Sequence, residues 1–194
     1  MLGPLLFLVF IGDLRNNLDP EVANILKYVD DSKILGFVKT VEDVNKLQIQ
    51  LEYIYKWADA NNMAWNKLKF QILRIGLDEK LKEDTKLLAP DKKLVIERKI
   101  IIKDLGILVD EKMKYSDHIQ KAISKARQKI GWISRTFKNR SIKILKTLWN
   151  SLVQSHMDYG SILWTPVINI TEIMAAEGQA LSEILPKWPM NVKT

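Results

Sequence analysis

The apolar and polar positions of the chain change their period several times, and each change marks an expected secondary-structure element. Between Asn24 and Phe37, two short apolar runs flank the adjacent carboxylates Asp30 and Asp31. Ile, Tyr, Val and Phe favour strands, whereas Asp favours turns. The pattern therefore predicts a β-hairpin with Asp30 and Asp31 at its bend.

The opening apolar stretch predicts a helix from Pro4 to Asn17, because the missing N–H of Pro4 costs nothing in the first turn. The stretch is apolar all round, so we expect protein to cover it on most sides and the chain to be cut from something larger. It is too short to span a bilayer and lacks the basic start and cleavage site of a signal peptide. We expect an intracellular protein, nuclear or cytoplasmic, with no membrane partner.

The middle of the chain alternates between helical and strand patterns. Thr40 and Asp43 form a weak capping box, and the apolar spacing that follows predicts an amphipathic helix to about Ala60. Alternation over residues 70–76 predicts a strand, and the charged stretch over residues 77–91 predicts a mobile loop or an irregular helix.

A second hairpin is expected after this stretch. Its strands run from Lys93 to Ile102 and from Leu105 to Val109, with a bend at Lys103-Asp104. We expect it to lie beside the first hairpin. The natural packing of these elements is an α+β arrangement, one antiparallel sheet with helices on a single face.

The last third of the chain predicts two helices joined as an αα-hairpin by Lys138-Asn139-Arg140. Ser116 is the expected N-cap of the first helix, and the second begins near Ser141 and ends near Tyr159-Gly160. From Thr165 onward the pattern weakens, and a loose tail is expected.

Composition narrows the kinds of site that the chain can build. An apolar fraction of 47% over 194 residues is enough for a core. The chain has no Cys and only two His, so disulfides and thiolate zinc sites are excluded and any metal would rest on carboxylates. Asp30 and Asp31 repel each other, and a divalent cation such as Mg²⁺ or Mn²⁺ would relieve that repulsion. The alternative is a solvated turn.

The positive charge is concentrated in one region. From Glu111 to Asn150 eleven Lys or Arg accompany two acids, a balance of +9, whereas the whole chain carries +7. A concentrated basic face favours a polyanionic partner, with nucleic acid ahead of an anionic membrane. The alternative is a solvated helix surface.

Several blocks, in a consistent order from residue 2 to residue 164, resemble the reverse transcriptases of non-LTR (LINE-type) retrotransposons. An aromatic-X-Asp-Asp motif alone would be a weak signal, but five ordered blocks are a specific one. The blocks similar to the polymerase palm and to the segment after it are Leu2-Gly3-Pro4-Leu5-Leu6-Phe7 with Asp13-Leu14, Tyr28-Val29-Asp30-Asp31, Trp57 through Asn66-Lys67-Leu68-Lys69, Leu105-Gly106-Ile107, and Asp110 to Trp164.

The resemblance implies an RNA-directed DNA polymerase whose two-metal site uses Mg²⁺ or Mn²⁺. Asp30 would be a metal ligand and Asp31 its neighbour in the same turn, while Tyr28 would seat the turn and touch the nucleic acid. Lys69 matches a lysine near the incoming triphosphate, where a cation would neutralise or protonate the leaving group. The alternative for Lys69 is a surface lysine beside a strand.

Further along the chain, the resemblance implies contacts with an RNA template and a DNA primer. Leu105 and Gly106 correspond to a hairpin that holds the primer end, and the alternative is an ordinary tight turn. The basic helix would be a thumb that lies along the duplex phosphates. Its expected contact residues are Lys121, Lys125, Arg127 and Lys129.

The chain also departs from the family's pattern. In the family, the metal site combines the Asp-Asp hairpin with a further aspartate from a strand that precedes the opening block. Neither this strand nor the fingers subdomain of the polymerase is present in the sequence. Asp13 and Asp110 are the nearest substitutes, and Val29 stands where Ala is more usual. We therefore expect a polymerase fragment that is inactive alone. Its expected parts are a partial palm over 1–110, a basic helical thumb over 111–164 and a weakly ordered tail over 165–194.

Two further hypotheses belong to other classes of protein. In one, the chain is a non-catalytic nucleic-acid-binding module that uses only the basic helical region. In the other, Trp132, Trp149 and Trp164 anchor a protein partner or a dimer, although such residues more often belong to the core. An uncovered apolar face on the opening helix is also expected to promote association with another chain or aggregation.

Overall fold

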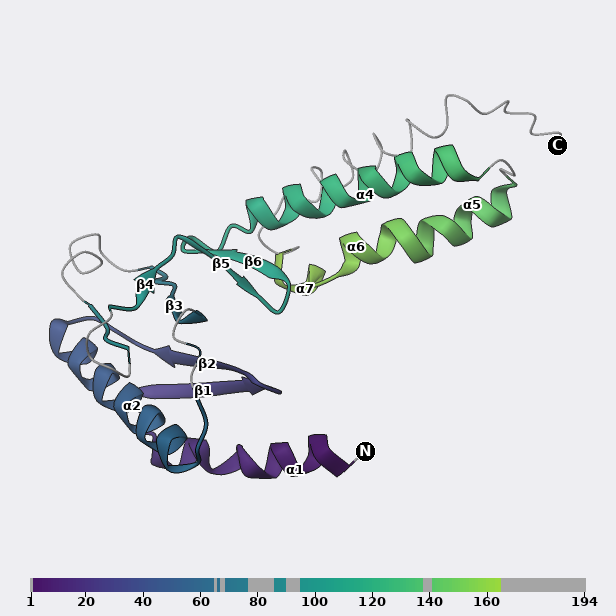
Figure 1. Ribbon diagram of the computed structural model, residues 1–194. Helices are drawn as coiled ribbons and strands as arrows, with labels where there is room; N and C mark the ends of the chain where they lie inside the picture. The colour runs from purple at the N-terminus through teal and green to yellow at the C-terminus, as the bar shows by residue number, and fades with distance from the viewer. Residues whose placement is uncertain are drawn as a thin grey trace. The chain divides into compact units, whose positions relative to one another are not determined.

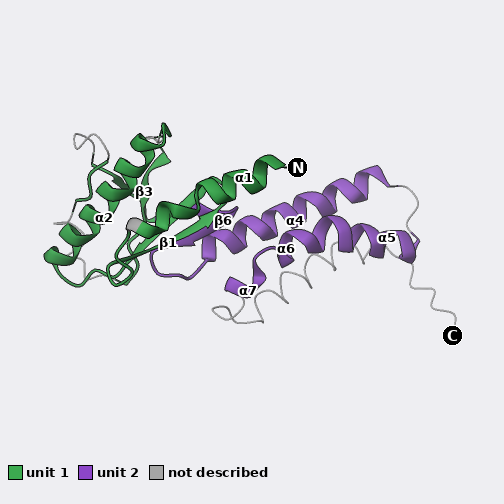
Figure 2. Cartoon of the chain, turned by 90° about the horizontal axis from the view of Figure 1, so that it is seen from below, with its two compact units in different colours: residues 1–100 green, residues 101–194 purple. Residues whose placement is uncertain are grey.

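The structure is a computed structural model that describes residues 2–64, 66, 69–76, 86–89, 95–137 and 141–164. Helices and short strands are mixed along the chain, so the expected combination of α and β elements is confirmed at that level. The chain forms two compact units that divide between Ile100 and Ile101 (Figure 2). Each unit has its own apolar core.

The first unit contains a β-hairpin, a long helix that lies against it, and shorter elements around them (Figure 1). In chain order these elements are α1 (Leu2–Phe10), the 3₁₀ helix η1 (Gly12–Asn17), β1 (Ala23–Tyr28), β2 (Asp31–Gly36), α2 (Val41–Ala60), β3 (Gln71–Ile72) and β4 (Glu97–Arg98).

Helix α2 carries the core of the first unit on two sides. On one side, Ile54 and Ala58 pack with Ile11 and Leu14 at η1 and with Ile25 of β1. On the other side, α2 packs against the described segments near β4, and the buried members of this cluster are Val44, Leu51, Tyr55, Leu87, Ala89 and Ile96. The amphipathic pattern of α2 thus places the hairpin on a fixed support.

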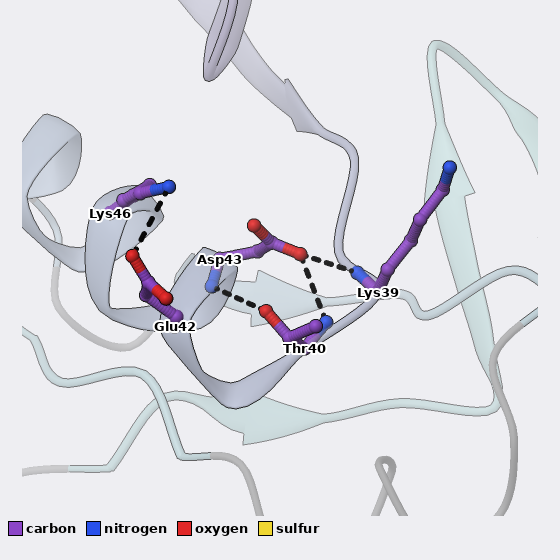
Figure 3. A network of polar contacts seen from close by, with 5 residues as sticks. All are labelled: Lys39, Thr40, Glu42, Asp43 and Lys46. Atoms are coloured by element: carbon purple, nitrogen blue, oxygen red, sulfur yellow. Dashed lines mark hydrogen bonds and ion pairs between the residues drawn. The ribbon is translucent and has the colours of Figure 1, made fainter.

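The start of α2 is confirmed as a capping box (Figure 3). The Thr40 hydroxyl accepts a hydrogen bond from the N–H of Asp43 at 3.3 Å, and the Asp43 carboxylate accepts from the N–H groups of Lys39 and Thr40, each at 2.9 Å. The N–H of Lys39, followed by that of Thr40, lowers the pKa of Asp43, because these donors favour the charged carboxylate. Together these bonds fix where the chain leaves β2 and enters α2.

Helix α1 differs from the expectation in length and in burial. It ends at Phe10, and η1 follows it, so residues 4–17 do not form one helix. None of its side chains is fully buried, and only Phe7 is partly buried against the core. The reason is that the helix is apolar all round, while only one of its sides contacts the rest of the first unit. The exposed apolar side chains are Leu2, Leu5, Leu6, Leu8, Val9 and Phe10.

No helix in the described part of the chain combines the length and the apolar composition that a membrane crossing requires. Helix α1 is apolar, but its 9 residues are far fewer than the roughly 20 that a membrane-spanning helix needs.

The second unit consists of a β-hairpin followed by helices that lie side by side (Figure 1). Its elements are β5 (Ile101–Asp104), β6 (Ile107–Asp110), α4 (Ser116–Thr136), α5 (Ile142–Leu148), the π-helical segment η3 (Trp149–Gln154), α6 (Ser155–Asp158) and α7 (Ser161–Trp164). Segments α5, η3 and α6 follow one another directly, and η3 and α6 pack along α4. The buried core between them consists of Ala126, Ile130, Ile133, Val153 and Met157.

The bend of the second hairpin lies two residues later than the pattern predicts. Asp104 pairs with Ile107, so the turn consists of Leu105 and Gly106 and not of Lys103-Asp104. Both turn residues have positive φ, 44° at Leu105 and 93° at Gly106, as a type I′ turn requires. Gly106 meets that requirement without steric cost, whereas Leu105 does not.

The predicted single antiparallel sheet does not form among the described residues. The strands make three separate pairs, β1 with β2, β3 with β4 and β5 with β6, and the β3–β4 pair is parallel. Strands β3 and β4 have two residues each and cannot extend a sheet. The β5–β6 hairpin packs within the second unit, where Ile107 joins Tyr115 and Trp164 in a core cluster. The pattern had placed this hairpin with the first unit, inside 1–110.

Helix α4 starts as predicted, but its cap differs. The residue before it, Tyr115, is the N-cap and has a left-handed backbone with φ 57°, so Ser116 is already helical. The predicted start of the second helix near Ser141 is confirmed, since α5 begins at Ile142. Ser141 is its N-cap, and its hydroxyl accepts from the N–H of Ile144 at 3.5 Å. The predicted connection at residues 138–140, the tail at 165–194 and most of the loop at 77–91 lie outside the described residues.

Candidate metal-binding turn and nucleic-acid-binding helix

The turn between β1 and β2 carries the two adjacent carboxylates. The strands pair in register from Ala23 with Gly36 to Tyr28 with Asp31, so the turn itself consists of Val29 and Asp30. The expectation of both aspartates at the bend is therefore corrected, because Asp31 is the first residue of β2. Asp30 lies at the tip of the hairpin and Asp31 follows it directly.

Val29 gives this turn an uncommon backbone. Its φ is 55°, in the left-handed region, where a β-branched side chain is sterically disfavoured. Gly or Asn would occupy such a position without that cost. Residues held in such conformations cluster at functional sites. The strain is therefore a structural reason to examine what the turn presents to solvent.

The side chains around the turn are open to solvent. Tyr28 is 63% exposed, and Val29, Asp30 and Asp31 are also exposed. In the described residues, no group of three or more His, Cys, Asp or Glu side chains is placed to hold a metal ion. Two neighbouring carboxylates fit one Mg²⁺ or Mn²⁺ whose other ligands are water or substrate oxygens, because such ions keep several waters in protein sites.

Asp13 and Asp110, the substitutes considered for a third carboxylate, both have structural partners. In the first unit, Asp13 Oδ1 accepts a hydrogen bond from Trp57 Nε1 at 3.1 Å. In the second unit, the carboxylate of Asp110 accepts from the backbone N–H groups of Tyr115, Lys114 and Lys112 at 2.7, 3.0 and 2.9 Å. Each carboxylate therefore organises the segment next to it.

The hydrogen bonds at Asp110 also change its acidity. Partial burial alone would raise the pKa of Asp110, but the N–H groups of Tyr115, Lys114 and Lys112 together lower it below its ordinary value. A folded-state pKa below the unfolded one adds stability that is present above the unfolded pKa and is lost as the pH falls through the folded pKa. Asp110 thus holds the entry to α4 as an ionised group.

Lys69 lies in the first unit, in a short turn before β3. Its side chain is exposed, and its backbone N–H donates to the carbonyl of Asn66 at 3.0 Å. Both the predicted role beside a triphosphate and the alternative of a surface lysine are consistent with this position. Residues 65, 67 and 68 lie outside the described residues.

The Leu105-Gly106 turn is held by a residue that the sequence reasoning did not single out. The hydroxyl of Tyr159 donates a hydrogen bond to the Leu105 carbonyl across 54 residues of sequence. A Cβ at Gly106 would lie 3.3 Å from the Tyr159 ring, and a Cβ at Gly160 would overlap the Ile107 side chain. Gly160 has no Cβ, so Ile107 can pack closely against it, and its φ of 69° is one that Gly adopts without steric cost. Both features help to place the neighbouring Tyr159 on the turn.

His118 is a second residue whose place the pattern did not reveal. It is buried in α4, and its Nδ1 accepts from the N–H of Leu108 in β6 at 3.4 Å. Burial lowers its pKa most, and Lys121 and Lys125 lower it further, while the backbone of Tyr159 acts in the opposite direction. A neutral imidazole therefore joins the hairpin to the first turn of α4.

Helix α4 separates the four predicted contact residues into two groups. Lys121, Lys125 and Lys129 are exposed at spacings of four residues, which places them in one row on one face. Arg127 lies two residues from Lys125, a rotation of about 200° around the helix, so it points away from the row. It borders a hollow of about 460 Å³ together with Arg135. Among the four expected contact residues, the three lysines therefore form a row and Arg127 lies outside it.

The three tryptophans of the association hypothesis also have different environments. Trp164 is only 3% exposed, and Trp149 is partly buried and donates its Nε1–H to Gln154 Oε1 at 3.1 Å. Trp132 alone among the three is at the surface, with 44% of it exposed. Trp164 thus belongs to the core and Trp149 to its margin.

Comparisons of the chain with protein-family models, with curated proteins and with solved structures find no match.

Proposed function

We propose that the chain is a palm and thumb portion of an RNA-directed DNA polymerase of the non-LTR retrotransposon type. In this proposal, the β1–β2 turn contributes metal ligands and α4 contacts nucleic acid. The observation that carries the proposal is the exposed Val29-Asp30 turn, in which Val29 has φ 55° and Asp30 is followed directly by the exposed Asp31 of β2. An ordinary solvated turn would not need a β-branched residue in the left-handed region.

The chemistry of nucleotide transfer explains why such a turn would be useful. A divalent cation held by Asp30 and Asp31 would supply positive charge to a phosphoryl transfer. The two carboxylates would fix its position at the tip of a hairpin that α2 supports. Tyr28 is paired with Asp31 and exposed beside it, where its ring would contact a nucleic acid strand.

We predict that the 194-residue chain binds nucleic acid but does not extend a primer. The physical reason is that the described residues place no third carboxylate beside Asp30 and Asp31, and a two-metal reaction needs ligands for two ions. The measurement is primer extension on an RNA template with Mg²⁺, together with binding of the same template–primer hybrid. Extension that Asp30→Ala abolishes would contradict the predicted inactivity, and a failure to bind the hybrid would contradict the proposal as a whole.

A second candidate function is a nucleic-acid-binding module without any role for the turn. The lysine row of α4 favours it, because three exposed cations on one helix face suffice to contact phosphates. The two candidates differ in their need for the aspartates. Asp30→Asn with Asp31→Asn would leave the module's binding unchanged at any metal concentration, whereas the polymerase proposal expects Mg²⁺ to increase hybrid binding in the wild type only.

A further inference from the structure

The lysine row of α4 (Lys121, Lys125 and Lys129) continues into an aromatic side chain. Trp132 follows Lys129 by three residues and Lys125 by seven, so it lies on the same face as the row. Helical side chains lean toward the N-terminus, which brings the indole over the turn that carries Lys129. Trp132 is 44% exposed although Trp is a large apolar residue.

The position of Trp132 is not fully explained by packing. Its ring contacts Phe137 edge to face, with ring centroids 5.7 Å apart and planes at 82°. This contact covers one part of the indole and leaves nearly half of the residue open. No hydrogen bond to Trp132 is found among the described residues, while Trp149 and Trp164 each donate one. The indole is thus available at the end of the lysine row.

Between Lys121 and Trp132, α4 carries no acidic side chain. Asp117 is the only acid in α4, and it lies in the first turn, four residues before Lys121, at the N-terminal end of the row. Successive lysines of the row are about 6 Å apart along the axis, because the helix rises about 1.5 Å per residue. The row therefore offers a linear track for consecutive phosphates of one strand.

A lysine track attracts any nucleic acid, but an exposed aromatic side chain distinguishes between strands. In a duplex the faces of the bases are stacked on one another, whereas an unpaired base offers its face to an aromatic ring. A basic track with an aromatic platform is the combination that single-strand-binding proteins use. Building on the proposed contact between α4 and nucleic acid, we infer that this face of α4 binds a single strand, with Trp132 stacked on an unpaired base.

The test compares two DNA strands of equal length and equal charge, one with bases and one abasic. The full chain should bind the strand with bases about tenfold more tightly, because stacking on one aromatic ring supplies roughly that factor. Trp132→Leu should remove this difference and leave the affinity for the abasic strand unchanged. The measurement is fluorescence anisotropy of end-labelled strands, with thermal unfolding of each variant as the check on folding.

Two further variants separate stacking from stability and from charge. Phe137→Leu removes the edge-to-face contact but keeps the indole, so it should keep the preference for bases. The triple replacement of the row should weaken the binding of both strands by the same factor; its substitutions are Lys121→Gln, Lys125→Gln and Lys129→Gln. Equal binding of the two strands by the wild type, or an undiminished preference in Trp132→Leu, would overturn the inference while leaving phosphate binding intact. Absence of binding to either strand would overturn the proposed contact of α4 with nucleic acid as well.

Discussion

Replacing Lys121, Lys125 and Lys129 together by Gln is expected to weaken the binding of an RNA–DNA hybrid by about tenfold to a hundredfold near 0.1 M salt. Each lysine that neutralises a phosphate releases condensed counterions, and the entropy of that release is the source of the affinity. The slope of log affinity against log salt should also become shallower by about 2 to 3, since each contact contributes roughly 0.7 to 0.9.

The control for this variant is a second triple variant with the same net charge as the first. Lys39, Lys46 and Lys56 are exposed lysines of the first unit, and their replacement by Gln removes the same three charges. We expect the control to lose little affinity and to keep the salt slope of the wild type. Equal losses in the two triple variants would show that the binding depends on overall charge, and the assignment of the lysine row would then be wrong.

Gly160→Ala is expected to destabilise the second unit by about 3 kcal/mol, the sum of a left-handed Ala and an overpacked contact. The φ of 69° disfavours any side chain, and the new Cβ would overlap Ile107. To avoid that overlap, either the buried Ile107 side chain must shift or the α6–α7 junction must move away from β6. Movement of the junction would also strain the bond from Tyr159 to the Leu105 carbonyl. The measurement is thermal unfolding followed by circular dichroism.

Gly131→Ala is the matched control for this substitution. A Cβ at Gly131 meets no atom of the described residues within 4 Å, and the residue lies inside α4 with an ordinary backbone. Since Ala is a better helix former than Gly, Gly131→Ala should be neutral or stabilising, by up to about 1 kcal/mol. If Gly160→Ala unfolds at the wild-type temperature, the account of the junction is contradicted.

Features set by neighbours in the sequence could be predicted well. Thr40 and Asp43 are three residues apart, and the capping box they form needs no information from elsewhere in the chain. Ser141 at the start of α5 is a similar case. The hairpin over residues 24–37 was also predictable, because its two strands are joined by a turn that Asp favours.

The register of that hairpin could not be read from residue preferences alone. Both aspartates favour turns, but the strand pairing places only Asp30 in the turn and leaves Asp31 in β2. The pairing follows from which side chains are buried, and Ala23 and Ile25 face the core only once η1 and α2 are in place. A shift of one residue would turn these side chains away from that core.

In the second unit, one feature could have been predicted from the sequence and another could not. The spacing of α4 already contains the separation of Arg127 from the lysine row, since two residues correspond to about 200° around a helix. The seat of the Leu105-Gly106 turn is different, because Tyr159 reaches it from a distant part of the chain. Contacts of that kind depend on the packing of the whole second unit and leave no local pattern.

The exposed face of α1 has a consequence for how the protein behaves in solution. Leu2, Leu5, Leu6, Leu8 and Val9 are each more than half exposed, and contiguous apolar surface of this kind promotes association. We therefore expect the chain to associate with itself or with another protein as its concentration rises.

We propose that Asp30, in the β1–β2 turn, and Asp31, at the start of β2, hold a divalent metal ion. This proposal is tested most directly by NMR, as the paramagnetic broadening of backbone amide signals during a titration with Mn²⁺. The account predicts that the amides of residues 28–32 broaden first, and that Asp30→Asn with Asp31→Asn abolishes this effect. Glu42 and Asp43 are also adjacent carboxylates of the first unit, but an ion pair and the capping box engage them, so their surroundings should broaden only at higher Mn²⁺. Broadening that is no stronger at the turn than at Glu42 and Asp43 would contradict the account.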